Sequence, residues 1–402
     1  MRVEAVVKAD AYGHGARPVA GWLERTGAVE GLCVATLDEG LDLREAGLAL
    51  PILVLYPVPP DGAIQAARAG LGVTVGDRVL LERTLRAIVD TSAPGTSGPA
   101  ALLALQVEVE TGLGRAGIAP RDLAAVVDAI RSARGVELVG LWSHLAAPED
   151  ADRSAAQAAR FDGALEAIGH DLGTDRGRRA VGHLAATGGL LAGSAPPYDS
   201  VRLGLGLYGV VPEGLTPAPA MRATAAALRP AMSLHARPVR VADLPAGHGV
   251  SYGPSFETGR PSRIATLPLG YGDGWPRGLS NRAEALVRGR RVPLIGTVAM
   301  DAVMADVTDV PGDPVGVDDE FVLLGQQAGP EGTDTITAAD LAQARTTISW
   351  EVLTAMSRRL PRVYHAAAVP VGVRTLAEEV HPWLPASSSG TEISATSRST
   401  PS

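Results

Sequence analysis

The residue that most clearly points to chemistry is Lys8, the single lysine among 36 basic residues, the others being arginine. Arginine can replace lysine as a positive charge, but its guanidinium keeps its proton near neutral pH and cannot form a Schiff base or act as an amine base. Lys8 lies within the apolar run VEAVVKA. A surface lysine that survived by chance is the alternative, and the apolar setting favours a reactive amine.

Glycine-rich segments hold further residues that could bind a ligand. Arg115 lies in TGLGRAG (111–117), and GHLAATGG (182–189) and VRLGLGLYG (201–209) combine glycine with hydroxyl or basic residues. Backbone amides and hydroxyls bind phosphate when such loops follow the last strands of a barrel. An arginine outside such a context is ordinarily a solvated surface charge, so these segments must be placed on structural elements.

The first half of the chain alternates strand-like apolar runs with helical patterns, which is typical of β/α units around a parallel sheet. Helices are expected where apolar residues recur at spacings of three and four, at 37–48, 122–133 and 154–168, with a polar loop at 91–99. Strands are expected at 3–8, 31–36, 51–56, 71–75, 101–109, 136–142, 180–185 and 200–203. This pattern predicts an α/β fold, a (β/α)8 TIM-type barrel over residues 1–225.

The barrel explains how these candidate residues could meet, because barrel active sites gather at the carboxyl ends of the strands. Lys8 ends the first expected strand, Arg115 follows the fifth, and His144, in LWSHLA, follows the sixth. A single histidine at such a place could equally be a satisfied core residue. The segments 182–189 and 201–209 follow the seventh and eighth strands, where phosphate sites are common.

A second domain with a different pattern follows the barrel. Short β-branched runs separated by Pro and Gly turns, such as RIATLPLGYGDG and RAEALVRGRRVPLIG, predict a mainly β domain over residues 226–385. Helical pattern there is limited to TAADLAQAR and WEVLTAMSRR. Residues 386–402 are rich in Ser and Thr with little to bury, so they are expected to form a disordered tail.

Composition narrows the class of partner. The formal net charge is -8 and no dense basic run occurs, which argues against nucleic acid or an anionic membrane as a partner. No apolar run approaches the ~18 residues of a membrane span, and the first residues lack the apolar core of a signal peptide. The only cysteine, Cys33, cannot form an internal disulfide. We therefore expect a cytoplasmic protein that acts on a small molecule, without a metal.

The decapeptide VVKADAYGHG (6–15) resembles the cofactor-binding lysine motif of the alanine racemases. The resemblance covers residues 1 to about 370 and includes VSYG (250–253), LPLGYGDGW (267–275) and GTVAMDAVM (296–304), in the family's order. It implies pyridoxal 5'-phosphate as the cofactor and alanine as the substrate, with D-alanine supplied for peptidoglycan. It also implies a homodimer in which the partner's second domain completes each active site.

The resemblance assigns roles to the barrel residues that match the family's motifs. Lys8 carries the cofactor, and its phosphate is contacted by Tyr12, Thr187, Gly204 and Leu205. Arg202 hydrogen-bonds the pyridine nitrogen and, being permanently cationic, keeps that nitrogen unprotonated. Negative charge then stays near the substrate α-carbon, which favours reprotonation there over transamination.

The resemblance also assigns residues to the substrate and to the entrance of the site. Arg115 reaches the cofactor's phenolic oxygen and the substrate carboxylate, and Met300 donates its backbone N–H to that carboxylate. His144 orients the catalytic tyrosine and Arg202. Tyr271 lies at the entrance, and Asp301 is a gate residue.

Two-base proton transfer is the mechanism that the resemblance implies, with Lys8 on one face of the substrate and Tyr252 of the partner subunit on the other. A phenol has an ordinary pKa of ~10 and is a poor base at neutral pH. Neighbours must therefore favour its ionised form, and His144 and Arg202 are the candidates.

The sequence departs from the family at several positions. Relatives carry a longer segment before the lysine motif, so we expect the start site to be misassigned. Ala186 stands where relatives have Asn before the phosphate-contacting hydroxyl, and Arg358 stands where they often have Tyr. These changes leave the exact substrate range open.

Glu108, in QVEVETGLGR, is a further departure, because many relatives have there a lysine whose carbamate holds the arginine of the next loop. We expect the Glu108 carboxylate to supply that negative charge and to orient Arg115. Glutamate is shorter than a carbamylated lysine, so a water, Glu110 or a small anion is expected to bridge the gap. The alternative is a strand residue with a packing role alone.

Other functions remain open from the sequence. A racemase of broader specificity, or one acting on serine, would use the same residues. A decarboxylase or aldolase on the same cofactor barrel would not need a second proton donor at Tyr252. A cofactor-carrying binding protein would lack the second domain.

Overall fold

The structure is a computed structural model that describes residues 1–91, 102–168, 174–175, 178–330 and 332–376. The chain divides into two units, Met1–Ser357 and a short unit that begins at Arg358. The tail expected at 386–402 lies outside the described residues. So does the polar loop expected at 91–99, apart from Thr91, which ends a helix.

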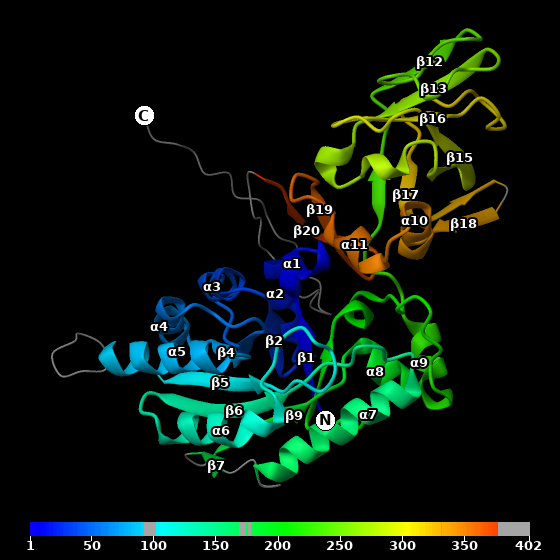
Figure 1. Ribbon diagram of the computed structural model, residues 1–402. Helices are drawn as coiled ribbons and strands as arrows, with labels where there is room; N and C mark the ends of the chain where they lie inside the picture. Colours follow the sequence, from blue (N-terminus) through cyan, green and yellow to red (C-terminus); the bar gives the residue numbers. More distant parts are fainter. Residues whose placement is uncertain (92–101, 169–173, 176–177, 331, 377–402) are drawn as a thin grey trace, which may run out of the picture. The chain divides into compact units, whose positions relative to one another are not determined.

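The amino-terminal part is a parallel eight-stranded sheet that forms a nearly closed barrel (Figure 1). The strand order is β10-β1-β2-β3-β4-β5-β6-β9, and a parallel bridge joins Arg202 of β10 to Ala186, three residues after the end of β9. The strands are β1 (Arg2–Val6), β2 (Gly31–Val34), β3 (Ile52–Val54), β4 (Gly72–Val75), β5 (Leu103–Glu108), β6 (Val136–Trp142), β9 (Val181–His183) and β10 (Ser200–Leu203). The expected strands and the TIM-type barrel are confirmed.

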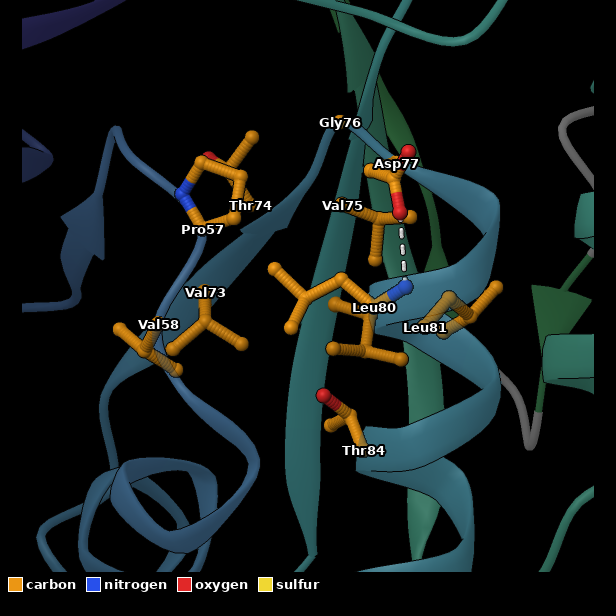
Figure 2. A pocket seen from close by; sticks show the side chains of 11 residues that line it. Pro57, Val58, Val73, Thr74, Val75, Gly76, Asp77, Leu80, Leu81 and Thr84 are labelled. Atoms are coloured by element: carbon orange, nitrogen blue, oxygen red, sulfur yellow. Dashed lines mark hydrogen bonds between the residues drawn. The ribbon is translucent and has the colours of Figure 1, made fainter.

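Helices connect the barrel strands, namely α2 (Ala16–Thr26), α3 (Leu37–Glu45), α4 (Pro60–Arg68), α5 (Arg78–Thr91), α6 (Leu123–Ser132), α7 (Ala151–Ala167) and α8 (Thr187–Ala192). The expected helices at 37–48, 122–133 and 154–168 are confirmed as α3, α6 and α7. Asp77 caps α5 by accepting a hydrogen bond from the backbone N–H of Leu80 at 2.8 Å (Figure 2). The side chains of α5 and β4 leave a cavity of only about 10 Å³ between them, so the helix packs directly on the strand.

The position of a strand between the barrel interior and the surrounding helices determines which of its residues are buried. Every residue of β2 and β3 is buried, because one face of each strand lines the barrel interior and helices cover the other. These strands therefore read as continuous apolar runs in the sequence rather than as an alternation of apolar and polar residues.

A mainly antiparallel sheet forms the second part of the first unit, as the sequence predicts. Its strand order is β11-β17-β14-β15-β16-β13-β12, and β18 pairs with β17. The strands are β11 (Leu234–Ala236), β12 (Arg240–Leu244), β13 (Ser262–Leu267), β14 (Glu284–Val287), β15 (Arg290–Ile295), β16 (Val303–Asp306), β17 (Phe321–Gly329) and β18 (Gly332–Ile336). Two helices follow them, α10 (Ala338–Arg345) and α11 (Ser349–Thr354).

Short elements complete the described chain, namely α1 (Lys8–Tyr12), β7 (Thr174–Asp175), β8 (Arg178–Arg179) and α9 (Arg222–Ala227), and the second unit contains the hairpin of β19 (Arg362–Ala366) and β20 (Val369–Arg374). Among the described residues, none of the helices has the length and apolar character needed to cross a bilayer.

Candidate active site

A pocket of about 510 Å³ opens at the carboxyl ends of the barrel strands. The elements after β1, β5, β6, β9 and β10 all contribute to its lining. The eight barrel residues to which the sequence assigns cofactor or substrate roles, or the orienting role of His144, line it together, namely Lys8, Tyr12, Arg115, His144, Thr187, Arg202, Gly204 and Leu205. The structure thus brings together residues that are up to 197 positions apart in the chain, from Lys8 to Leu205.

Lys8 lies two residues beyond the end of β1, at the start of an unusual turn. The next four residues, 9–12, all have left-handed backbone dihedrals, with φ between 52° and 55°. This conformation costs about 1–2 kcal/mol for each L-residue, and it persists only where surrounding contacts enforce it. The side chain of Glu39 accepts a hydrogen bond from the backbone N–H of Ala9 at 2.7 Å, and Asp10 accepts one from Ala16 at 2.9 Å.

The electrostatic surroundings of Lys8 favour a neutral amine. Burial lowers the pKa of its ammonium group, and the positive charges of Arg115 and Arg202 lower it further, while Glu39 opposes them. A larger fraction of Lys8 is therefore neutral at a given pH than for an exposed lysine. Only the neutral amine can act as a nucleophile or a base.

Tyr12, Thr187 and the loop after β10 form a small polar cradle. The hydroxyl of Thr187 accepts hydrogen bonds from the backbone N–H groups of Gly204 at 3.1 Å and Gly206 at 3.2 Å. A Cβ at Gly204 would lie 2.7 Å from the Tyr12 hydroxyl, so only glycine fits there. Burial raises the pKa of Tyr12 to about 12, which keeps its hydroxyl a donor.

Arg202 is buried, and both terminal nitrogens of its guanidinium bind other groups of the protein. It donates to the carbonyl oxygens of Ser143 at 2.6 Å and Leu184 at 3.1 Å, and it also donates to Nδ1 of His183. Its guanidinium also faces the Trp142 ring, with Cζ 4.9 Å from the ring centroid. These contacts fix the position of a permanent positive charge at the floor of the pocket.

His183 and Gln106 support Arg202, and neither was predicted from the sequence. Because Arg202 can only donate, His183 Nδ1 must accept, and the ring proton lies on Nε2, 2.7 Å from the Gln106 side-chain oxygen. Burial and the charge of Arg202 hold the pKa of His183 well below its usual range, so the ring is neutral. A signal was present, since Gln106 is a polar residue within the apolar strand LALQVE.

His144 also accepts from Arg202, with its Nδ1 3.3 Å from Nη2. Burial lowers the pKa of His144 to about 3, and the charges of Arg202, Arg115 and Lys8 contribute. The ring is therefore neutral and carries its proton on Nε2. That proton is available to donate to a further group.

Glu108 contacts Arg115 directly, with Oε1 3.1 Å from Nη2. The expectation that a water, Glu110 or an anion must bridge the gap is therefore wrong. The loop 109–118 turns back on itself, since the N–H of Ile118 donates to the carbonyl of Glu108 at 2.7 Å, and this brings Arg115 within reach of the shorter side chain. Glu110 instead accepts from the backbone N–H groups of its own loop, including that of Gly114 at 2.9 Å.

The second-domain residues singled out from the sequence, Tyr252, Tyr271, Met300 and Asp301, do not line this pocket. All are exposed, and the exposed fractions are 73% for Tyr252, 41% for Tyr271 and 51% for Met300. Their loops are joined to each other. The Ser251 hydroxyl donates to the carbonyl of Thr297 at 2.5 Å, and the N–H of Tyr271 donates to Ala299 at 3.0 Å.

A second cavity of about 700 Å³ lies at the amino-terminal ends of the barrel strands. Three of its charged lining residues, Glu4, Glu30 and Arg44, are hydrogen-bonded within the barrel. Glu4 accepts from Ser200 at 3.3 Å and from Cys33, and Arg44 donates to the carbonyl oxygens of four residues. Within the described residues no cluster of His, Cys, Asp and Glu is arranged to hold a metal. The barrel residues singled out from the sequence thus meet in the pocket around Lys8 and not in this second cavity.

Comparison with known proteins gives a consistent result. The family model for the alanine racemase N-terminal domain matches residues 1–212, and that for the alanine racemase C-terminal domain matches residues 231–364. The chain is 40% identical over 369 residues to an alanine racemase of Sorangium cellulosum, covering 90% of this chain and 91% of the relative. It is 39% identical over 368 residues to that of Symbiobacterium thermophilum, covering 90% of each.

Solved structures agree with the sequence matches. The alanine racemase of Bacillus anthracis, with bound L-Ala-P, superposes with a TM-score of 0.80 at 29% identity, covering 94% of this chain and 92% of that chain. The alanine racemase of Streptomyces coelicolor superposes with a TM-score of 0.76 at 34% identity, covering 90% of this chain and 91% of that chain.

Proposed function

The chain belongs to the alanine racemase family and is an amino-acid isomerase, and on that premise we propose that it interconverts L-alanine and D-alanine with pyridoxal 5'-phosphate as its cofactor. The observation that carries the proposal is the convergence of the single lysine, Lys8, with Arg115, Arg202 and the cradle of Thr187 in one pocket. A pocket of about 510 Å³ lies within the usual range for small-molecule and cofactor sites.

The donor set fits the phosphate of this cofactor. Because the backbone N–H groups of Gly204 and Gly206 donate to the Thr187 oxygen, the hydroxyl hydrogen of Thr187 can donate to a phosphate oxygen, and the Tyr12 hydroxyl lies against Gly204. Phosphate is bound in barrels by N–H groups and hydroxyls of the loops after the seventh and eighth strands. Tyr12, Thr187, Gly204 and Leu205 would hold the phosphate.

The remaining groups fit the aldehyde and the ring. The amine of Lys8, with its lowered pKa, would hold the aldehyde carbon, and Arg202 would donate to the ring nitrogen. When bound, pyridoxal phosphate withdraws electrons into its ring and so acidifies the α-hydrogen of the attached amino acid. The fixed positive charge of Arg202 disfavours a proton on that nitrogen, which favours return of the proton to the α-carbon.

Arg115 would bind the substrate carboxylate, because its guanidinium lies in the pocket and is oriented by Glu108 at 3.1 Å. The backbone N–H of Met300 would donate to the same carboxylate. A small substrate side chain is consistent with a pocket shared between cofactor and substrate.

Inversion at the α-carbon needs proton transfer on two opposite faces, since a base fixed on one face returns the hydrogen to that same face. Lys8 would take or return the proton on one face. Tyr252 Oη would do so on the other, and His144 Nε2–H is available to orient that hydroxyl.

We infer that Tyr252 acts from a partner subunit in a homodimer. Tyr252, Tyr271 and Met300 are exposed in one chain and come from joined loops. Clustered exposed aromatic and apolar side chains are typical of protein–protein contacts. Tyr271 would lie at the entrance and Asp301 at its edge as a gate. We place the activity in the cytoplasm, where D-alanine would serve peptidoglycan synthesis.

A chiral assay tests the proposal. L-alanine and D-alanine supplied separately should each yield an equal mixture of both enantiomers, because the two have the same free energy. Serine and leucine are assayed alongside to separate an alanine racemase from a broader one. Release of carbon dioxide without inversion, or absence of D-alanine from an L-alanine reaction, would contradict the proposal.

A further inference from the structure

Gln157 on α7 lies outside the pocket, yet it joins two of the loops that build it. Its side-chain nitrogen donates to the Thr111 hydroxyl at 3.1 Å and to the His144 carbonyl at 2.9 Å. Its side-chain oxygen accepts from the backbone N–H of Ala146 at 2.8 Å. The residue is 3% exposed, so water does not replace these bonds. Both hydrogens and the oxygen of this amide are therefore used to join the loop after β5 to the loop after β6.

The hydroxyl groups of Ser143 and Thr111 extend this link, and the direction in which each of them donates its hydrogen is determined. The Ser143 hydroxyl donates to the carbonyl of Val109 at 2.7 Å, which uses its one hydrogen. The Thr111 hydroxyl, 2.7 Å from Ser143, must then donate to Ser143 and accept from Gln157. Each hydrogen donated in this hydrogen-bond network has one acceptor. An apolar replacement at Gln157 would therefore leave the N–H of Ala146 and the carbonyl of His144 without this partner.

The loop that carries Arg115 is held by α7 at a second point. Arg160, three residues after Gln157, donates to the carbonyl of Thr111 at 2.6 Å. Gly112 has φ +135°, which L side chains rarely adopt, and a Cβ there would lie 2.9 Å from the Arg160 guanidinium, so another residue would strain the turn and displace that guanidinium. The loop ends are closed by a hydrogen bond from the N–H of Glu110 to the carbonyl of Ile118 at 3.0 Å.

We propose that Gln157 is a positioning residue that keeps Arg115 and His144 in a fixed relation to each other. The proposal rests on the proposed function, in which Arg115 binds the substrate carboxylate and His144 orients the proton-transferring hydroxyl. Reacting groups must be placed to within about 1 Å, because misplacement on that scale can cost about 100-fold in rate. An amide that binds both loops holds them together.

Hydrogen exchange tests the coupling without reference to activity. In Gln157→Leu, amide exchange should become faster in 110–117 and in 144–147 together, with little change in the barrel strands. Thr111→Val removes the bond from Gln157 and the bond to Ser143 but keeps the Gln157 bonds to Ala146 and His144, so exchange should rise in 110–117 and not in 144–147. Gln65→Leu, an exposed glutamine on α4, is the matched control and should change neither segment.

Kinetics tests the consequence for the reaction. Gln157→Leu should raise KM for both alanine enantiomers about tenfold, the effect of roughly 1.4 kcal/mol, and lower kcat for both. Thr111→Val should raise KM with little effect on kcat, because His144 keeps its bond to Gln157. Because both substitutions interrupt the same hydrogen-bond network, the double variant should have the same KM and kcat as Gln157→Leu alone.

Each outcome bears on the proposal. Exchange that stays unchanged in either loop of Gln157→Leu, or rises uniformly over the barrel with a lowered Tm, would overturn it. If Gln157→Leu does not fold, Thr111→Val decides, and wild-type exchange in 110–117 contradicts the proposal. A wild-type protein that does not racemise alanine would contradict the proposed function instead, while the exchange result still decides whether Gln157 couples the loops.

Discussion

Replacing Glu108 by glutamine removes the negative charge that holds Arg115 while keeping nearly the same shape. Glu108 is 3% exposed, and its carboxylate lies 3.1 Å from the guanidinium of Arg115, whose side chain is 39% exposed. Gln retains an oxygen that can accept from Arg115, so the loss is the charge-assisted part of the bond rather than the whole contact. Arg115 binds the substrate carboxylate in our account, so the change should appear in substrate binding.

The size of the effect follows from the bond and its exposure. A hydrogen bond to a charged group contributes about 1.5–3 kcal/mol. Because solvent screens the partly exposed guanidinium of Arg115, we expect Glu108→Gln to lose about 1–2 kcal/mol of substrate-binding free energy. We therefore expect KM for alanine to rise about 5- to 30-fold, with kcat nearly unchanged, since Glu108 touches no transferred proton.

Steady-state kinetics at a series of pH values is the assay. Burial raises the pKa of Glu108, against the opposing charge of Arg115, so the carboxylate takes up a proton at a higher pH than an exposed glutamate does. Wild-type KM should then rise as the pH falls through this raised pKa, whereas KM of Glu108→Gln should stay flat there.

The matched control is Glu82→Gln, which breaks an exposed Arg–Glu pair on α5 and should leave KM unchanged. Bicarbonate should not affect the wild-type enzyme, because the charge is supplied by the protein itself. Wild-type kinetics from Glu108→Gln would refute the reasoning, and a strong chloride dependence of the wild type would show that a borrowed anion holds Arg115.

Three further outcomes are expected. Tyr252→Phe should cripple racemisation far more than cofactor binding, with the loss largest for proton abstraction from one enantiomer; equal α-hydrogen exchange from both enantiomers would count against two bases. Inactive Lys8→Ala and Tyr252→Phe chains, mixed under conditions of subunit exchange, should recover some activity, and none after verified exchange would indicate a self-contained site. Gly204→Ala should weaken cofactor binding in an absorbance titration, because its Cβ would meet the Tyr12 hydroxyl at 2.7 Å, whereas Gly278→Ala, with nothing within 4 Å, should bind as the wild type does.

The barrel and much of the pocket were predictable because their signals are local. Strands buried on both faces appear as apolar runs, and the single lysine marks a position where arginine chemistry does not suffice. Glycine-rich loops after the seventh and eighth strands predict a phosphate site, which stays a prediction, and the structure brings Thr187 and Gly204 of those loops together.

The features that sequence reasoning missed depend on distant partners. The left-handed turn after Lys8 opposes the preference of its four non-glycine residues, and one of its contacts, from Glu39, comes from another helix. The chain from Gln106 through His183 to Arg202 joins three strands. The reach of Glu108 was misjudged because bond counting along one side chain ignores how the loop brings Arg115 back toward β5.

Reduction of the purified protein with borohydride, followed by peptide mass analysis, tests the central claim most directly, because the chain has a single lysine. We predict that a pyridoxyl group becomes fixed on Lys8, and that Lys8→Arg loses this label, the visible absorbance and the interconversion of L- and D-alanine together. An unlabelled Lys8 in an active wild-type protein, or racemisation by Lys8→Arg, would contradict the account.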